Sequence, residues 1–136
     1  MTKKRRKKKS NKYFTIVHEN AILEYIGSED QNFRNEIYRN VIQPVFKEMI
    51  SKIVFTYKFT NLPNVESLKD ECEMHLVTIL SNFDPSKGSK AFSYFSVITK
   101  NWFIAKVKKT AIQLRREAHY DEISKRVEMD HLSIYN

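Results

Sequence analysis

Residues 82–109 read NFDPSKGSKAFSYFSVITKNWFIAKVKK, a short turn that leads into a long helical pattern. Pro85 and Gly88 indicate the turn, because proline fixes one backbone angle and glycine accepts a left-handed conformation. The pattern after the turn carries five aromatic side chains among lysines. A helix of this composition is either a core helix with solvated lysines or a surface on which bases stack while cations contact phosphates.

Periodicity within this pattern favours a central core helix over residues 91–117. Steps of 100° per residue place its apolar side chains on two roughly opposite arcs. One arc holds Phe103, Ile104, Val107, Ala111 and Leu114, and the other holds Phe95, Ile98, Trp102 and Ala105. A helix that is apolar on two sides is either central in a bundle or uses its second face for a partner. The pattern alone leaves both roles open.

The rest of the chain predicts three more helices and no sheet. Only two glycines and three prolines are present, too few for the turns of a many-stranded fold. Apolar side chains recur at helical spacing over residues 17–28, 30–59 and 65–81. Pro44 interrupts the second of these and must kink or break it. We expect an all-α domain of about four helices over residues 13–118, followed by an extension over residues 119–136 that is a helical end or a tail.

Charge is distributed unevenly along the chain. Residues 1–12 hold eight Lys/Arg and no acid, which predicts a disordered basic tail, and the remaining 16 Lys/Arg balance the 16 Asp/Glu. Residues 66–73, ESLKDECE, hold four acids and one lysine, whereas residues 84–116 hold eight Lys/Arg against Asp84 alone. The sequence therefore predicts an acidic helix next to a basic one.

Several classes of protein are disfavoured by what the sequence lacks. No run of 18 apolar residues predicts a membrane span. The single cysteine, Cys72, excludes an internal disulfide framework and suits a reducing cytoplasm. Cys72 and His75 form only half of a zinc site, so we expect no metal and no cofactor. No acid is paired with a base or nucleophile in a recognisable catalytic pattern, so we do not expect an enzyme.

The order and spacing of residues 65–117 resemble the central, region 2-like domain of bacterial RNA polymerase sigma factors. In that family an acidic helix ends in a Phe–acid–x–x–x–Gly turn that leads into an aromatic-rich basic helix, as SNFDPSKG and KAFSYFSVITKNWFIAKVKK do here. The chain is most similar to the late-transcription sigma factors of tailed bacteriophages, which share NFD and a lysine pair at the helix end. The resemblance covers most of residues 11–118.

The resemblance implies two binding surfaces. The acidic helix docks on the clamp helices of the β′-type subunit of core RNA polymerase, with Asp70, Glu71 and Glu73 as contacts. The following turn and helix recognise promoter DNA at the minus-ten element. The DNA-binding residues implied are Lys87, Lys90, Tyr94, Phe95, Lys100, Asn101, Trp102, Lys106, Lys108 and Lys109.

Within the implied DNA surface, Tyr94 stands where the family has an aromatic residue that melts the duplex. Lys100 and Asn101 stand where it has a basic residue and an amide that face DNA. Primary sigma factors carry a tryptophan pair where this chain has Val97 and Ile98. Phe95 and Trp102 fit either a core role or a role in DNA binding.

The resemblance also implies helper proteins. No second helical domain for a minus-thirty-five element follows residue 118, so we expect an A/T-rich minus-ten promoter and transcription late in phage infection, in the cytoplasm of a bacterial host. The late phage factors bind a coactivator and the DNA sliding clamp. Leu132, Ile134 and Tyr135 in MDHLSIYN have the character of a clamp-binding peptide.

A second interpretation rests on charge alone. A net charge of +8, with eight of the cations in the first twelve residues, also fits a small RNA-binding or ribosome-associated helical protein. Such a protein need not bind core polymerase, whereas a sigma factor must.

Overall fold

The computed structural model describes the backbone of residues 13–135 and the side chains of residues 13–132. Its α-helices are α1 (Ile16–Gly27), α2 (Gln31–Ile37), α3 (Gln43–Thr56), α4 (Val65–Ile79) and α5 (Ala91–Tyr135). A π-helical segment, Tyr38–Ile42, joins α2 to α3 without a break, so the two form one long helical unit. The all-α prediction is confirmed: helices make up most of residues 13–135, and no strand occurs there. The tail predicted over residues 1–12 lies outside the described residues.

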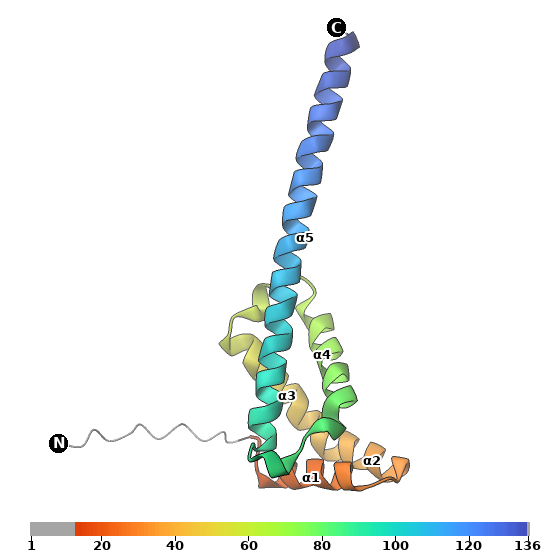
Figure 1. Cartoon of the computed structure of the whole chain (residues 1–136), viewed down its shortest axis with the longest axis vertical. Helices are drawn as coiled ribbons and strands as arrows, with labels where there is room; N and C mark the ends of the chain where they lie inside the picture. The colour runs from red at the N-terminus through yellow and green to blue at the C-terminus, as the bar shows by residue number, and fades with distance from the viewer. Residues whose placement is uncertain (1–12, 136) are drawn as a thin grey trace, which may run out of the picture.

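The helices form a compact body from which α5 projects (Figure 1). In that body α5 runs beside α3 and α4, while α1 and α2 lie across one end. Three short 3₁₀ segments complete the connections: Phe59–Asn61, Leu80–Asn82 and Pro85–Lys87. The far half of α5 leaves the body. Because α5 is one continuous helix of 45 residues, the boundary predicted at residue 118 falls inside it.

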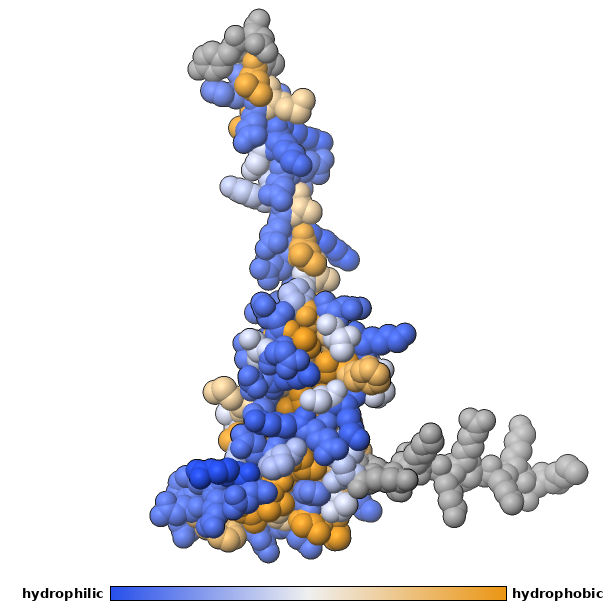
Figure 2. Space-filling model, turned by 180° about the vertical axis from the view of Figure 1, so that it is seen from behind, coloured by the Kyte–Doolittle hydropathy of each residue, from blue (hydrophilic) through white to orange (hydrophobic). Residues whose placement is uncertain are grey.

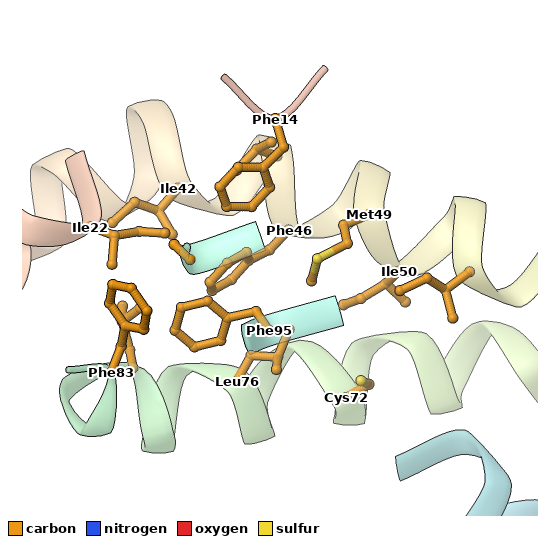
Figure 3. Close-up of a cluster of buried hydrophobic side chains, with 14 of the residues drawn as sticks. Phe14, Ile22, Ile42, Phe46, Met49, Ile50, Cys72, Leu76, Phe83 and Phe95 are labelled. Carbon is orange, nitrogen blue, oxygen red and sulfur yellow. The ribbon is translucent and has the colours of Figure 1, made fainter. Parts of the chain in front are cut away.

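Aromatic side chains from three helical units meet in the centre of the core (Figure 3). The ring of Phe95 lies 5.1 Å from that of Phe46 on α3 and 5.8 Å from that of Phe83, measured between centroids. Farther along α5, the ring of Phe103 stacks on Phe59 at 5.5 Å. Such ring pairs add to the free energy gained by burying the area itself. The core therefore ties α5 to α3 and to the 3₁₀ segment that begins at Phe59.

A single stripe of α5 is buried, where the sequence predicted two apolar arcs. Ala91, Phe95, Thr99 and Phe103 recur every fourth residue, and each is 0% exposed. The stripe passes from one predicted arc to the other, because a step of four residues advances 40° around a helix with 3.6 residues per turn. The Thr99 hydroxyl is satisfied inside the core, since it donates a hydrogen bond to the Phe95 carbonyl at 2.8 Å. Phe95 and Phe103, which lie on different arcs in the sequence pattern, therefore share the buried side of α5.

A side chain from α1 caps the start of α5. Both carboxylate oxygens of Glu19 accept a hydrogen bond from the Ala91 N–H, at 2.9 and 3.1 Å. The first N–H groups of a helix have no partner inside the helix, and a carboxylate also interacts favourably with the positive end of the helix dipole. Residues 72 positions apart in the sequence are thus joined at the point where α5 begins.

At the other end of α1 a guanidinium contacts the last carbonyl groups of the helix. Gly27 is the last residue of α1, and Ser28 is the C-cap in an extended conformation. The Arg34 side chain donates hydrogen bonds to the carbonyls of Ile26 and Ser28 and stacks over the Tyr25 ring. A cation suits the negative end of a helix. Arg34 therefore fixes the tight corner between α1 and α2.

Pro44 is accommodated by a change of helical type. It lies in the first turn of α3, where its missing N–H is least costly, directly after the π-helical segment. The wider π turn gives room for the ring, which would clash with the carbonyl one turn back in a regular helix. Pro44 thus changes the helical geometry at this point without ending the helix.

Two details of α4 differ from simple helical expectations. Asn64 is of a residue type that often caps helices, but its backbone is left-handed with a φ of 57°, and its side chain makes no capping hydrogen bond. Cys72 is fully buried, whereas Met74, the larger apolar side chain two residues on, is 70% exposed. Burial raises the pKa of the Cys72 thiol from 9.0 to about 12.

The contact between Glu19 and Ala91 predicts a measurable contribution to stability. Glu19→Ala should lower the free energy of unfolding by about 1–2 kcal/mol, because it leaves the first N–H of α5 without its partner. Glu24→Ala is the matched control, since Glu24 is exposed on the same helix. Urea denaturation followed by circular dichroism measures both variants. Equal stability of the two variants would contradict the capping role.

The buried thiol predicts slow labelling of the folded protein. At pH 8, Cys72 in the folded chain should react with a thiol reagent at least about a hundredfold more slowly than in urea, because it is both inaccessible and protonated. Its raised pKa also means that the unfolded chain ionises first, so stability should fall as the pH rises from 9 towards 12. Rapid labelling under native conditions would place Cys72 outside the core.

Candidate nucleic-acid interface

The face of α5 opposite its buried stripe is open to solvent. We define the outer strip as Lys90, Ser93, Val97, Asn101, Ala105 and Lys108, all of which are exposed. These residues also recur at three or four positions, so they lie along one side of the helix. Val97 is 58% exposed at the middle of the strip. Because the core fixes the opposite face, the orientation of this strip relative to the body is fixed as well.

The predicted turn places two lysines at the start of this strip. Gly88 has a φ of 84°, a left-handed conformation that favours glycine. The Asp84 carboxylate accepts hydrogen bonds from the backbone N–H and the hydroxyl of Ser86, and these bonds lower its pKa. Lys87 and Lys90 are both exposed in and after this turn. The turn therefore presents cations where α5 begins.

Lys100, beside the outer strip, contacts Tyr57, a residue that the sequence pattern did not indicate. Its Nζ lies 4.3 Å from the ring centroid of Tyr57, the residue that ends α3. Such a contact attracts a cation to the face of the ring. Tyr57 is itself 47% exposed, so an aromatic face and a cation meet at the surface. No helical periodicity connects residues 57 and 100, and only the packing of α3 on α5 brings them together.

Trp102 and Lys106 lie on the side of α5 that faces α4. The Lys106 Nζ lies 4.8 Å from the Trp102 ring centroid and 3.9 Å from the Glu71 carboxylate. The Trp102 ring packs edge-on against Phe103 at 4.9 Å. Both side chains are half-buried. They form a border between the acidic helix and the outer strip.

Tyr94 and Phe95 have different environments although they are adjacent. Phe95 is fully buried between α3 and the Phe83 turn, so the expectation that it stacks on bases is wrong. Tyr94 is half-buried, and its ring packs against Phe83 with 5.4 Å between centroids. Tyr94 therefore combines an anchored ring with partial access to solvent.

Of the remaining residues predicted to bind DNA, Asn101, Lys108 and Lys109 are exposed. The structure thus gathers most of the predicted set around one open side of α5. Phe95 is excluded from it by burial, and Lys106 points towards α4.

The four acidic side chains of α4 are not equally exposed. Glu66, Asp70 and Glu71 are exposed. Glu73 is half-buried, and its carboxylate accepts a hydrogen bond from the Tyr38 hydroxyl at 3.3 Å. Burial, together with the charge of Glu73, raises the pKa of Tyr38 well above its ordinary value. Glu73 thus contributes to the contact of α4 with the preceding helical unit, whereas Glu71 reaches α5 through Lys106.

A shallow groove runs between α3 and α4 beside these acids. Its lining is of mixed charge: Lys47, Ile50, Ser51, Glu66, Lys69, Asp70 and Glu73. Lys69 pairs with Glu66 at 3.2 Å, so part of the acidic charge is balanced within α4. Asp70 is exposed at the same groove.

At the far end of α5, Leu132 is 63% exposed, as a peptide-binding role requires, whereas the side chains of Ile134 and Tyr135 lie outside the described residues.

Across the part of the chain that the structure describes, no helix has both the length and the apolar character needed to cross a membrane. Within the same part, no three His, Cys, Asp or Glu side chains converge on a possible metal position.

Comparisons of the chain with models of protein families, with curated proteins and with solved structures give no match. The geometry and chemistry of the acidic face of α4 and the outer strip of α5 are therefore what a functional proposal rests on.

The contrast between the two faces of α5 predicts a contrast in stability. Phe95→Ala should lower the free energy of unfolding by about 3–5 kcal/mol, because it opens a cavity in the core. Val97→Ala, two residues away, should change it by less than about 0.5 kcal/mol, because Val97 is exposed on the outer strip. Thermal and urea unfolding of both variants measure the difference. Similar losses for both would mean that the two faces are assigned incorrectly.

Proposed function

We propose that the chain is a sigma factor that binds core RNA polymerase and directs it to A/T-rich minus-ten promoters. The observation that carries the proposal is the arrangement of two surfaces on neighbouring helices. The exposed acids of α4 and the exposed amide and lysines of α5 are separated by one border, Trp102 and Lys106, and are linked in the chain by the turn at Gly88. This arrangement supports simultaneous contact with a protein and with DNA.

The acidic face of α4 suits a basic partner surface on core polymerase. Charged residues at an interface guide association and exclude partners of the wrong sign. Asp70 and Glu71 are the best candidates, because both are exposed and neither is needed to hold α3 against α4. Glu73 has a different role in this proposal, since its bond to Tyr38 positions α4 on the preceding helical unit.

The outer strip of α5 suits an opened DNA strand. Lysines at both ends of the strip attract phosphates, and Asn101 offers both a donor and an acceptor to a base edge. Tyr94 provides a ring on which an unpaired base stacks. The strip has Val97 where primary sigma factors carry a tryptophan, so the stacking surface is smaller. This favours A/T-rich sites, whose strands separate most easily.

The remaining parts of the proposal follow from the resemblance. They are late transcription in phage infection, the cytoplasm of a bacterial host, and helper proteins, the coactivator and sliding clamp, bound through the end of α5. The exposed Leu132 supports a peptide contact there.

The polymerase contact can be tested by co-elution with bacterial core RNA polymerase. We expect Asp70→Lys combined with Glu71→Lys to weaken binding at least about tenfold, because both reversals oppose the same basic surface. The control is Glu24→Lys combined with Glu29→Lys, which changes the net charge equally at exposed positions away from α4. Glu73 is left unchanged so that the fold is preserved.

Co-elution of the wild type and of the control variant, with loss for the α4 variant, supports the proposal. If the wild-type chain binds structured RNA or ribosomes but not core polymerase, the RNA-binding alternative replaces it. Equal binding by all three proteins would mean that α4 is not the docking surface.

The role of Tyr94 can be tested by promoter opening. Tyr94→Ala should reduce the permanganate reactivity of minus-ten thymines, because stacking on a base contributes about 1–3 kcal/mol. Tyr94→Phe keeps the ring and its contact with Phe83, so it should keep most of the activity. A template already mismatched over the element should restore transcription by the alanine variant. Failure of this rescue at a temperature where the variant is folded would exclude a role in strand opening.

A further inference from the structure

More than half of α5 has little contact with the body. We define the projecting segment as residues 105–132. Its first turn still contacts α4 through Lys106 and Glu71, and the rest of it leaves the compact domain in Figure 1. From residue 111 to residue 132 every side chain except Ser124 is exposed. Isolated helices are marginally stable in water, and the side-chain pairs along the segment, Gln113 with Glu117 and Glu122 with Arg126, contribute little each. A partner that covers the segment would stabilise it.

Charge divides this segment into two halves of opposite sign. Residues 105–116 hold five Lys/Arg and no acid. Residues 117–132 hold five acids against Lys125 and Arg126. A second copy lying parallel would place like charges together, whereas an antiparallel copy brings the basic half of one chain against the acidic half of the other. The segment is therefore complementary to itself in one direction only.

One side of the segment also carries a contact line in which apolar side chains are interspersed with charged and polar ones. Ala105, Lys109, Ile112, Arg116, His119, Ile123 and Val127 follow one another in steps of three or four residues, the spacing of a helix–helix seam. Ile112, Ile123 and Val127 are between 45% and 62% exposed. A shallow groove follows the first part of this line, lined by Ala105, Lys108, Lys109, Ile112, Gln113 and Arg116. Apolar and polar side chains alternate over the projecting part of α5 in Figure 2.

We propose that the projecting segment pairs antiparallel with the same segment of a second copy of this chain. In the register that suits both charge and the contact line, Ile112 lies opposite Val127 of the other copy. Arg115 then lies beside Glu122 of the other copy on the flank of the seam. Two-fold symmetry repeats each of these contacts. The argument for this pairing does not rest on the proposed role in transcription, although the groove along the first part of the contact line shares Ala105 and Lys108 with the outer strip.

The self-association can be measured by sedimentation equilibrium of the full chain, from low micromolar to the highest concentration it tolerates. We expect a monomer–dimer equilibrium for the wild type. Arg115→Glu alone or Glu122→Lys alone should weaken it about tenfold, because each reversal acts at both symmetric contacts. An equimolar mixture of the two variants should recover the wild-type affinity. Lys125→Glu, on the side of the helix away from the seam, should leave association unchanged.

Cysteine cross-linking tests the direction of pairing, and buried Cys72 does not interfere. Ile112→Cys mixed with Val127→Cys should form an interchain disulfide under a glutathione redox buffer. Ile112→Cys alone should not, because its two copies would lie about 22 Å apart at 1.5 Å per residue. A wild-type chain that stays monomeric at every concentration, or efficient cross-linking of Ile112→Cys with itself, would overturn the proposal. In the first case the segment must bind a different partner or none.

Discussion

The structure depends on one buried stripe along α5. Phe95 and Phe103 insert between α3, the Phe83 turn and Phe59, with Ala91 and Thr99 between them. Small residues let the neighbouring helices approach, and the Thr99 hydroxyl is satisfied by the carbonyl of its own helix. Glu19 fixes where this helix begins. These contacts set both the position and the rotation of α5.

The fixed rotation of α5 determines which of its residues face solvent. Because the stripe occupies one side, Asn101 and the lysines of the outer strip must face solvent. The side towards α4 carries Lys106, which reaches Glu71 and so joins the basic and acidic surfaces. A protein contact on α4 and a DNA contact on α5 would therefore be held at a constant geometry by the core. A sigma factor needs such geometry, since it must hold polymerase and promoter in register.

Local sequence pattern was sufficient for the helices, their order and the turn at Gly88, because these depend on neighbouring residues. It was not sufficient for properties that depend on packing. Phe95 could not be assigned to the core from periodicity, because the buried stripe crosses from one apolar arc to the other. The choice between Cys72 and Met74 required the position of α5, and the contact of Tyr57 with Lys100 joins distant segments. Most residues of the candidate DNA surface could be predicted from the sequence. The position of Trp102 and Lys106 at the border with α4 could not.

The central claim is that these two surfaces act together in transcription initiation. The most direct measurement maps RNA 5′ ends made by bacterial core polymerase, with and without the full chain, on a template containing an A/T-rich minus-ten element. The account predicts a defined start site downstream of the element that appears only when the chain is present and disappears when the element is replaced by G/C pairs. Identical 5′ ends with and without the chain, on A/T-rich templates and in the presence of sliding clamp and coactivator, would contradict it.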